Sequence, residues 1–504
     1  MTSHWLGFTQ YRSASALLSV AALTACFNPQ GRALLDTDEA GSGSSTTTST
    51  TFTTVGSATG GMDSEDTTES SESTESSESS GGEGACVPGE PGCTHELDLV
   101  FVVDNSATMG EEQQRLARSF PAFVEQLRGL TDDHGDPVGL DVHVMVTTTD
   151  MGYLACEPFT PTGYEPAMGA PVGTACADRL GDFNGEQQAC TQQCPVAVAP
   201  AADFVTFDAT SSNVDAPPAD IDGDGVDESP AAQALACLGP QGLVGCGFES
   251  PLESMLQAIE PEAPWNQGVV PFLREGATLG IVIVTDEADC SAGDPTIFAD
   301  PSLYNINPST GTPQMSSALC WNAGVSCEGD GHSGYDSCTA TDEDTLFRVQ
   351  RYTDALIEQV RETDGKEVFM LGIVGVPPVT AHDSAPPFAP TEGGVHELSY
   401  HDWRPGLHPR GDMILPDIQQ GLLAEDKQWE FGIGPGCTAQ DDSGEYTGQA
   451  IAPVRLLETC QALDLDDTAA GTRCCMESVC DGDYAGAVDC LTGLVRLTTE
   501  SAMP

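Results

Sequence analysis

The amino-acid sequence predicts an α/β fold, in which helices flank a doubly wound, mostly parallel β-sheet. Two runs, 97–103 and 279–285, are almost entirely apolar and have the length of buried strands. Strands that helices cover on both faces have this unbroken apolar character. The first run ends at Asp104 and the second at Asp286, and open α/β sheets bind ligands at the carboxyl ends of their strands.

The other core elements are expected to alternate with these strands. Further apolar runs predict strands at 140–146 and 368–374. Helices are expected at 116–130, 252–259, 346–360, 453–462 and 484–494, the first three because apolar residues recur three and four positions apart. Loop insertions are expected at about 152–230, 288–343 and 376–440. We therefore predict one α/β domain over residues 86–504, interrupted by disulfide-rich insertions.

A polar motif follows the first strand and suggests a metal site. Asp104, Ser106 and Thr108 stand at alternate positions, and all three offer the hard oxygen ligands that Mg²⁺ prefers. The Asp-x-Ser-x-Thr spacing resembles the metal-ion-dependent adhesion site of von Willebrand factor type A domains, where a later strand delivers an aspartate at the place of Asp286. The resemblance implies that Mg²⁺, or Mn²⁺ or Ca²⁺, binds a carboxylate of a protein partner. The alternative is a strand end whose side chains cap the next helix and bind nothing.

Three further segments resemble, more narrowly, a group of bacterial type A lipoproteins without an assigned function. They are TDEADCS at 285–291, GCGFESPLESML at 245–256 and CDGDYAGAV at 480–488. This narrower resemblance refines the expected fold and location but implies no ligand.

The chain departs from the adhesion-site pattern at one position. The family uses a threonine from the loop before a central helix, and the corresponding residues here, 245–250, contain none. Glu249 or Ser250 could replace it as a metal ligand. A carboxylate from Glu249 would lower the positive charge available to attract an acidic partner, so the departure weakens the expectation of ligand binding more than that of metal binding.

A second group of acids suggests a calcium loop. It consists of Asp220, Asp222, Asp224 and Asp227. Acids at alternate positions followed by Gly225 resemble the start of an EF-hand loop, in which carboxylates surround Ca²⁺ and the glycine permits a sharp turn. The closing Glu of that loop is replaced by Ala231, so a complete EF-hand is not expected. The alternative is a solvated acidic turn.

The N-terminal residues resemble the leader of a bacterial lipoprotein. Arg12 precedes an apolar run at 14–22 that is too short to span a bilayer. The following Leu-Thr-Ala-Cys sequence resembles a lipobox, which implies a signal peptide over 1–26 and acylation of Cys26; an ordinary secretory signal is the alternative. Residues 27–85 are rich in Ser, Thr, Gly and Glu and are expected to form a disordered tether. We expect an exported protein that is lipid-anchored to the bacterial envelope, at the outer membrane or the cell surface.

The cysteines support export. Setting Cys26 aside from the 19 cysteines leaves 18, an even number that is typical of a disulfide framework. Local bridges are expected for Cys86–Cys93, Cys190–Cys194 and Cys237–Cys246. The adjacent Cys474 and Cys475 are expected to bond to different partners. Zinc is the rival interpretation, but paired Cys-x-x-Cys knuckles do not occur.

The charge and the motifs restrict the function. With 17 basic and 78 acidic residues the chain has a net charge of −61, which disfavours binding to nucleic acid or to anionic lipid headgroups, so membrane contact is expected only through the lipid anchor. Nucleophile elbows, phosphate loops and HExxH helices do not occur in the sequence, so we do not expect an enzyme. The sequence favours a binding module that engages a protein partner through a divalent cation. The alternatives are a structural envelope scaffold stabilised by calcium and disulfides and, more remotely, a hydrolase with its site in the insertions.

Overall fold

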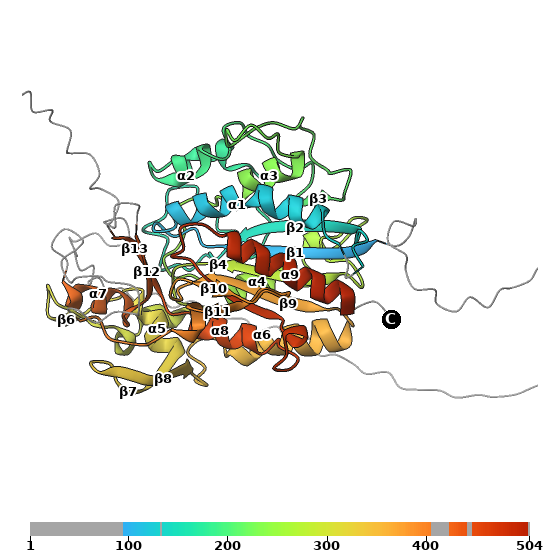
Figure 1. Cartoon of the computed structure of the whole chain (residues 1–504). Helices are drawn as coiled ribbons and strands as arrows, with labels where there is room; N and C mark the ends of the chain where they lie inside the picture. The colour runs from blue at the N-terminus through green and yellow to red at the C-terminus, as the bar shows by residue number, and fades with distance from the viewer. Residues whose placement is uncertain (1–93, 132–133, 405–422, 441–445, 502–504) are drawn as a thin grey trace, which may run out of the picture. The chain divides into compact units, whose positions relative to one another are not determined.

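A six-stranded sheet forms the centre of the structure, in the order β3-β2-β1-β4-β9-β14 (Figure 1). The computed structural model describes residues 94–131, 134–404, 423–440 and 446–501. The expected signal peptide with Cys26, the tether at 27–85 and the Cys86–Cys93 bridge lie outside the described residues. The strands of the sheet are β1 (His95–Val103), β2 (Leu140–Thr148), β3 (Val205–Phe207), β4 (Thr278–Val284), β9 (Val368–Val374) and β14 (Cys474–Ser478).

The strand directions confirm an α/β fold with a mainly parallel sheet. β1 pairs in parallel with both β2 and β4, and β9 and β14 continue the parallel arrangement. The short edge strand β3 pairs with β2 in the antiparallel direction. Strands β2 and β3 follow β1 towards one edge of the sheet, and β9 and β14 follow β4 towards the other edge. The direction in which successive strands are added therefore reverses between β1 and β4. The sequence did not predict β3, which lies within the expected insertion at 152–230, or β14.

Helices cover both faces of the sheet. On one face α1 (Gly110–Arg128) lies between α3 (Pro230–Leu238) and α9 (Ala485–Ser501) (Figure 1). On the other face α4 (Pro251–Ala258), α6 (Val349–Asp354) and α8 (Val454–Gln461) pack against the strands. α6 continues as a π-helical segment at Ala355–Thr363. The apolar side chains of β1 alternate between the two cores, which explains why the strand is apolar almost throughout.

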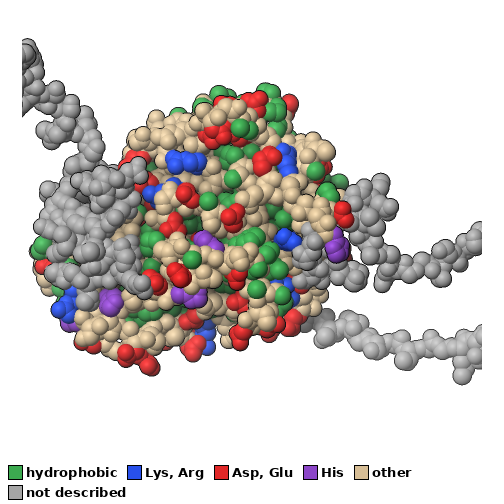
Figure 2. All heavy atoms as spheres, viewed as in Figure 1, with side chains coloured by type: hydrophobic (Ala, Val, Ile, Leu, Met, Phe, Trp, Pro, Cys, Tyr) green, Lys and Arg blue, Asp and Glu red, His purple; other side chains and the backbone are tan. Residues whose placement is uncertain are grey.

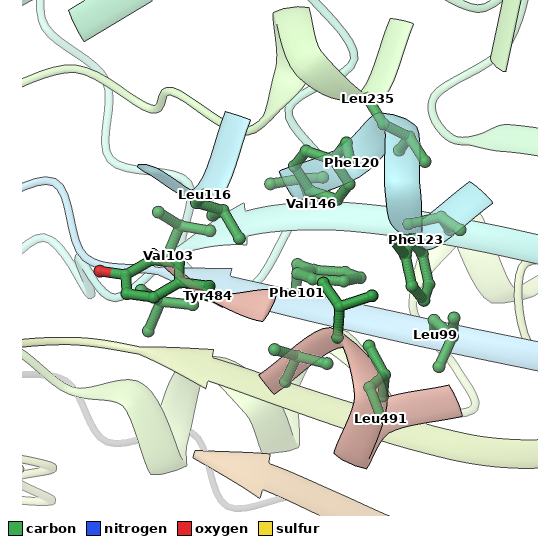
Figure 3. Close-up of a cluster of buried hydrophobic side chains, with 14 of the residues drawn as sticks. Leu99, Phe101, Val103, Leu116, Phe120, Phe123, Val146, Leu235, Tyr484 and Leu491 are labelled. Atoms are coloured by element: carbon green, nitrogen blue, oxygen red, sulfur yellow. The ribbon is translucent and has the colours of Figure 1, made fainter. Parts of the chain in front are cut away.

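Aromatic rings dominate the core between the sheet and α1. Phe101 of β1 lies 5.2 Å from Phe120 and 5.9 Å from Phe123, measured between ring centroids. Leu491 of α9 packs into the same cluster (Figure 3). The two phenylalanines of α1 are three positions apart, so they lie on one face of the helix and meet the same strand.

The remaining elements belong to the connecting segments. Their helices are α2 (Gln188–Thr191), α5 (Ala318–Gly324) and α7 (Ala424–Phe431). Their strands form the two-stranded hairpins β5 (Ile306–Asn307) with β6 (Thr312–Pro313), β7 (Val325–Asp330) with β8 (Gly334–Ala340), β10 (Ala381–His382) with β11 (Pro390–Glu392), and β12 (Pro435–Gln440) with β13 (Tyr446–Ile451). None of these hairpins joins the central sheet.

Eight disulfides link cysteines within the described residues. They are Cys156–Cys246, Cys176–Cys190, Cys194–Cys237, Cys290–Cys320, Cys327–Cys338, Cys437–Cys480, Cys460–Cys474 and Cys475–Cys490. The different partners of Cys474 and Cys475 are confirmed. The expected bridges Cys190–Cys194 and Cys237–Cys246 are wrong, because helices α2 and α3 bring cysteines from distant positions together and proximity in sequence is not what decides the pairing.

The surface is acidic, as the composition requires. On the face shown in Figure 2, Asp and Glu side chains are spread over the described residues, and Lys and Arg are fewer. Within the described part of the chain, a helix with the length and apolar character needed to cross a bilayer does not occur.

We expect Phe120→Ala to lower the free energy of unfolding by about 3–5 kcal/mol, because the ring is buried and its removal leaves a cavity beside Phe101. Urea denaturation with the disulfides intact measures this change. As a control, Val269→Ala removes a side chain that is 99% exposed and should change stability by less than about 0.5 kcal/mol. Equal effects of the two substitutions would contradict the assignment of this core.

Candidate metal centre

The candidate site lies where β1 and β4 end side by side. The backbone amide of Asp104, just after β1, donates to the carbonyl oxygen of Val284 at the end of β4, at 2.9 Å. Asp286 follows β4 two residues later. Because the strand order reverses between these strands, the chain leaves them in opposite directions and a crevice opens at their carboxyl ends. The fold therefore brings the two predicted aspartates to one edge of the sheet.

Asp104 is fully buried and held by hydrogen bonds. The Ser106 amide donates to its Oδ1 at 2.7 Å, and the Thr285 hydroxyl donates to its Oδ2 at 2.6 Å. Burial raises the pKa of Asp104 to about 6, although these hydrogen bonds lower it in part. The carboxylate is thus positioned by both strands, in a place where its charge lacks water.

Two hydroxyls of the predicted motif meet beside this carboxylate. Ser106 Oγ and Thr108 Oγ1 are 3.3 Å apart, and the Thr108 side chain is exposed. The Thr108 hydroxyl also hydrogen-bonds to the Asp286 side chain. Ser106, Thr108 and Asp286 therefore form one continuous group of oxygen atoms.

Asp286 faces a cavity. Its Oδ1 is buried and lacks a hydrogen-bond partner among the described residues. Thr108 and Asp286 line a cavity of about 180 Å³, together with Glu111, Glu112 and Glu186 and with residues of the β12–β13 hairpin. The cavity connects the strand-end oxygens with solvent, and its wall is acidic.

The side chains of Glu249 and Ser250 have different partners in the structure. Glu249 is fully buried, accepts a short hydrogen bond from Thr149 Oγ1, and has a second oxygen, Oε1, without a partner. Ser250 turns its hydroxyl to Tyr153 Oη, at 3.0 Å, and lies at the N-terminus of α4. Of the two candidate replacements for the missing threonine, Glu249 is the one whose charge acts on Asp104.

Further acids approach the same place. Asp150 follows β2 and is buried, where it accepts hydrogen bonds from Cys246 N at 3.0 Å and Tyr164 Oη at 2.8 Å. Glu287 is half-buried next to Asp286. The sequence analysis did not assign either residue to the site. Asp150 could have been predicted as a site residue, because it follows the expected strand at 140–146 just as Asp104 and Asp286 follow theirs.

The carboxylates oppose one another's ionisation. Burial, then the charge of Asp104, raises the pKa of Glu249 and of Asp286 well above the usual range. The same two causes raise the pKa of Glu287 to about 8. Like charges in a poorly solvated place are unfavourable unless a cation neutralises them.

Few basic groups balance this charge. Lys427 Nζ lies 2.8 Å from Glu430, and Arg115 lies 3.1 Å from Glu112. Lys427 lowers the pKa of Glu287 only as a minor cause.

The group of oxygens is therefore suited to a small divalent cation held directly by hydroxyls. Asp104, Glu249 and Asp286 do not bring carboxylate oxygens within 4.8 Å of one another, so they would act in part through water.

The acidic loop forms a separate group. Asp220, Asp222 and Asp224 are exposed and place carboxylate oxygens within 4.8 Å of one another, whereas Asp227 does not join them. Asp220 accepts from the amides of Gly223 at 2.7 Å and Gly225 at 3.0 Å. Gly225 has φ +91°, a conformation that glycine adopts without strain. Glu228, which ends this acidic segment but was not among the expected calcium ligands, closes the loop, because its Oε2 accepts from Ile221 N at 2.8 Å.

The chain was also compared with known proteins. Neither the protein-family models nor the curated sequences gave a match.

We expect Glu112→Gln to stabilise the chelator-treated protein at neutral and alkaline pH. Burial raises the pKa of Glu112 from 4.5 to about 7 in the folded state, despite the nearby Arg115. The folded state then binds the proton more tightly than the unfolded state, so the free energy of unfolding falls as the pH rises from about 4.5 to about 7. The substitution removes this loss, on the order of 1–3 kcal/mol at pH 8.

Urea denaturation of both proteins between pH 4.5 and pH 8, with EDTA present, measures the difference. Glu111→Gln is the matched control, because Glu111 pairs with the same Arg115 at 3.1 Å but its side chain is 60% exposed. A constant gap between wild type and Glu112→Gln over this pH range would contradict the assignment.

Proposed function

We propose that this protein is a cell-envelope lipoprotein of the von Willebrand factor type A kind, which binds a protein partner through a divalent cation at the strand-end site. The observation that best supports the proposal is the position of Asp286. Its unpartnered, buried Oδ1 and the adjacent Thr108 hydroxyl line a cavity, while Asp104 and Ser106 lie directly beside them. A buried carboxylate oxygen without a partner, next to hydroxyl oxygens and acidic side chains, favours a hard cation.

In this proposal each residue has a defined part. The Ser106 and Thr108 hydroxyls bind Mg²⁺, or Mn²⁺ or Ca²⁺, directly, and Asp104 and Asp286 supply charge directly or through water. The partner fills the open position with a carboxylate. Because Glu111 and Glu186 line the approach, a partner that carries basic side chains beside its carboxylate would be favoured. The site binds and does not catalyse, and the lipid anchor at Cys26 would be the protein's contact with the membrane.

A second candidate is a structural scaffold of the envelope that holds calcium for stability alone. Two observations favour it. Glu249 places a carboxyl group, whose pKa burial and the charge of Asp104 raise, where the adhesion-site pattern has a neutral threonine. When a bound cation ionises this carboxyl, the cation is partly neutralised and would attract an external carboxylate less. Eight disulfides within the described residues cross-link the chain, which suits a structural protein of the envelope.

We expect Thr108→Ala to weaken Mg²⁺ and Mn²⁺ binding at least tenfold and to leave the fold intact. Thr108 is exposed and its loss removes one ligand, whereas the hydrogen bonds that hold Asp104 come from Ser106 and Thr285. Isothermal titration of the chelator-treated protein with each ion measures the affinity, and Thr310→Ala, at another exposed threonine, is the control. Unchanged affinity in Thr108→Ala would exclude the strand-end site.

A partner assay separates the two candidates. Envelope extract is passed over immobilised wild type and Thr108→Ala, with Mg²⁺ or with EDTA. The binding module requires a protein retained only by wild type with Mg²⁺. The scaffold requires no such protein, together with a lower melting temperature of wild type after chelation.

For the acidic loop we propose a separate Ca²⁺ site formed by Asp220, Asp222 and Asp224, with Asp227 supplying further charge. We expect Ca²⁺ to protect residues 215–230 from proteolysis, and Asp222→Ala with Asp224→Ala to abolish that protection without affecting Mg²⁺ binding at Asp104. Limited proteolysis and calcium titration measure both effects. If the affinity is no better than millimolar, or does not depend on these aspartates, the loop is a solvated turn.

A further inference from the structure

A second polar cavity lies at the carboxyl end of β14. It shares no lining residue with the cavity at Asp286, although Val479 and Cys480, which line that cavity, lie between Ser478 and Asp481 of this one. It has a volume of about 280 Å³ and is bounded by the end of β14, the first turn of α9 and the β10 strand. The polar side chains that line it are His382, Glu477, Ser478, Asp481, Asp483 and Tyr484. None of the described residues that line it is Lys or Arg, so its fixed charge is negative.

A histidine and a buried glutamate meet in this cavity. The two carboxylate oxygens of Glu477 lie 3.0 Å and 3.3 Å from Nε2 of His382. The Glu477 side chain is 3% exposed, whereas that of His382 is 28% exposed and open to the cavity. The two side chains are hydrogen-bonded to each other in this structure. Because nitrogen and oxygen ligands about 2.0–2.1 Å from a tetrahedral Zn²⁺ are roughly 3.3 Å apart, a metal ion could replace the shared proton with only a small movement of the two groups.

The electrostatic surroundings favour a cation at this pair. Burial, followed by the charges of Asp481 and Asp489, raises the pKa of Glu477 to about 8. Asp483 accepts from the amide of Ala485 at 3.0 Å, and this bond occupies a free N–H at the beginning of α9. Asp481 Oδ2 accepts from the Val379 amide at 3.4 Å and lines the same cavity. Asp481 and Asp483 thus place negative charge near the His382 imidazole, and a cation bound there would favour the ionised form of Glu477.

Gly486 allows the imidazole to reach its position. A Cβ atom at residue 486 would lie 2.6 Å from Cε1 and 2.7 Å from Nε2 of His382, which is closer than carbon atoms approach one another. Any larger residue in this turn of α9 would therefore displace the ring. The absence of a side chain at Gly486 therefore leaves room for His382 Nε2, the nitrogen that faces Glu477.

We propose that this cavity binds a transition-metal dication of the Zn²⁺ class through His382 Nε2 and Glu477, with Asp481 and water completing the coordination. An imidazole ligand favours Zn²⁺ over Mg²⁺ or Ca²⁺, which prefer oxygen ligands alone. His382 and Glu477 are close together, but the three ligand atoms of His382, Glu477 and Asp481 do not all lie within 4.8 Å of one another, so Asp481 must come closer or bind through water when the ion binds.

Titration of the full chain, prepared without a histidine tag and stripped with chelator, tests the proposal. With millimolar Mg²⁺ present to occupy the strand-end site, wild type should bind one equivalent of Zn²⁺ at this cavity. His382→Ala should lose that equivalent, and Gly486→Ala should weaken it at least tenfold although it removes no ligand. His396→Ala is the matched control, since its Nε2 contacts the Pro390 carbonyl at 3.1 Å outside the cavity, and it should bind as wild type does.

Co²⁺ absorption supplies a second readout that does not depend on the stability of one variant. A visible d–d band that appears in wild type, and is lost in both His382→Ala and Gly486→Ala, supports the proposal. Equal Zn²⁺ stoichiometry in wild type and His382→Ala, or no Zn²⁺ binding in wild type, overturns it. Thr108→Ala should retain the Zn²⁺ equivalent, so the outcome for this cavity is independent of the outcome for the strand-end site.

Discussion

The constraint on which the rest of the structure depends is the burial of carboxylates at the carboxyl ends of β1, β2 and β4. Asp104, Asp150 and Asp286 follow these three adjacent strands, and Glu249 enters from the loop before α4. Ionised groups in such a place are costly unless hydrogen bonds or a cation compensate them. The protein supplies hydrogen bonds to Asp104 and Asp150 almost completely, but it leaves one oxygen of Asp286 and one of Glu249 without a partner. This imbalance, more than the Asp-x-Ser-x-Thr spacing, is the physical basis of the proposed cation site.

The connecting segments enclose these carboxylates. The disulfide Cys156–Cys246 joins the loop after β2 to the loop that carries Glu249. The Gly245 amide donates to the Asn105 carbonyl at 2.9 Å, and a side chain at residue 245 would collide with Asn105. On the opposite side the Ile451 amide donates to the Asp286 carbonyl at 2.7 Å, which brings the β12–β13 hairpin against the cavity. The insertions thus form the walls of the site, and the sheet provides its base.

A buried ion pair ties the same region to the helices below the sheet. Arg455 of α8 and Asp289, which follows β4, are both almost fully buried, and the Nε to Oδ2 distance is 2.8 Å. Asp289 Oδ1 also accepts from the Leu252 amide in the first turn of α4, at 3.2 Å. Removing one partner of such a pair leaves an uncompensated buried charge, which is strongly destabilising. Through Asp289 the pair also links the start of α4, which follows Glu249, to the segment after β4.

The sequence by itself determined the elements whose signals are local. Runs of mainly apolar residues identified β1, β2, β4 and β9, because strands covered on both faces need apolar residues along most of their length. Asp104 and Asp286 were assigned to one site through the resemblance to the adhesion-site pattern, and the parallel strands that precede them do end at a common edge. Tertiary structure decided what depends on distant parts of the chain. β3 and β14 are short, and the disulfides of Cys190 and Cys237 join residues 14 and 43 positions apart, so local patterns did not reveal them. The sequence could not tell whether Glu249 or Ser250 faces the site, because the packing of an irregular loop decides where each side chain points. The contact between His382 and Glu477 was not visible in the sequence either, because these residues are 95 positions apart.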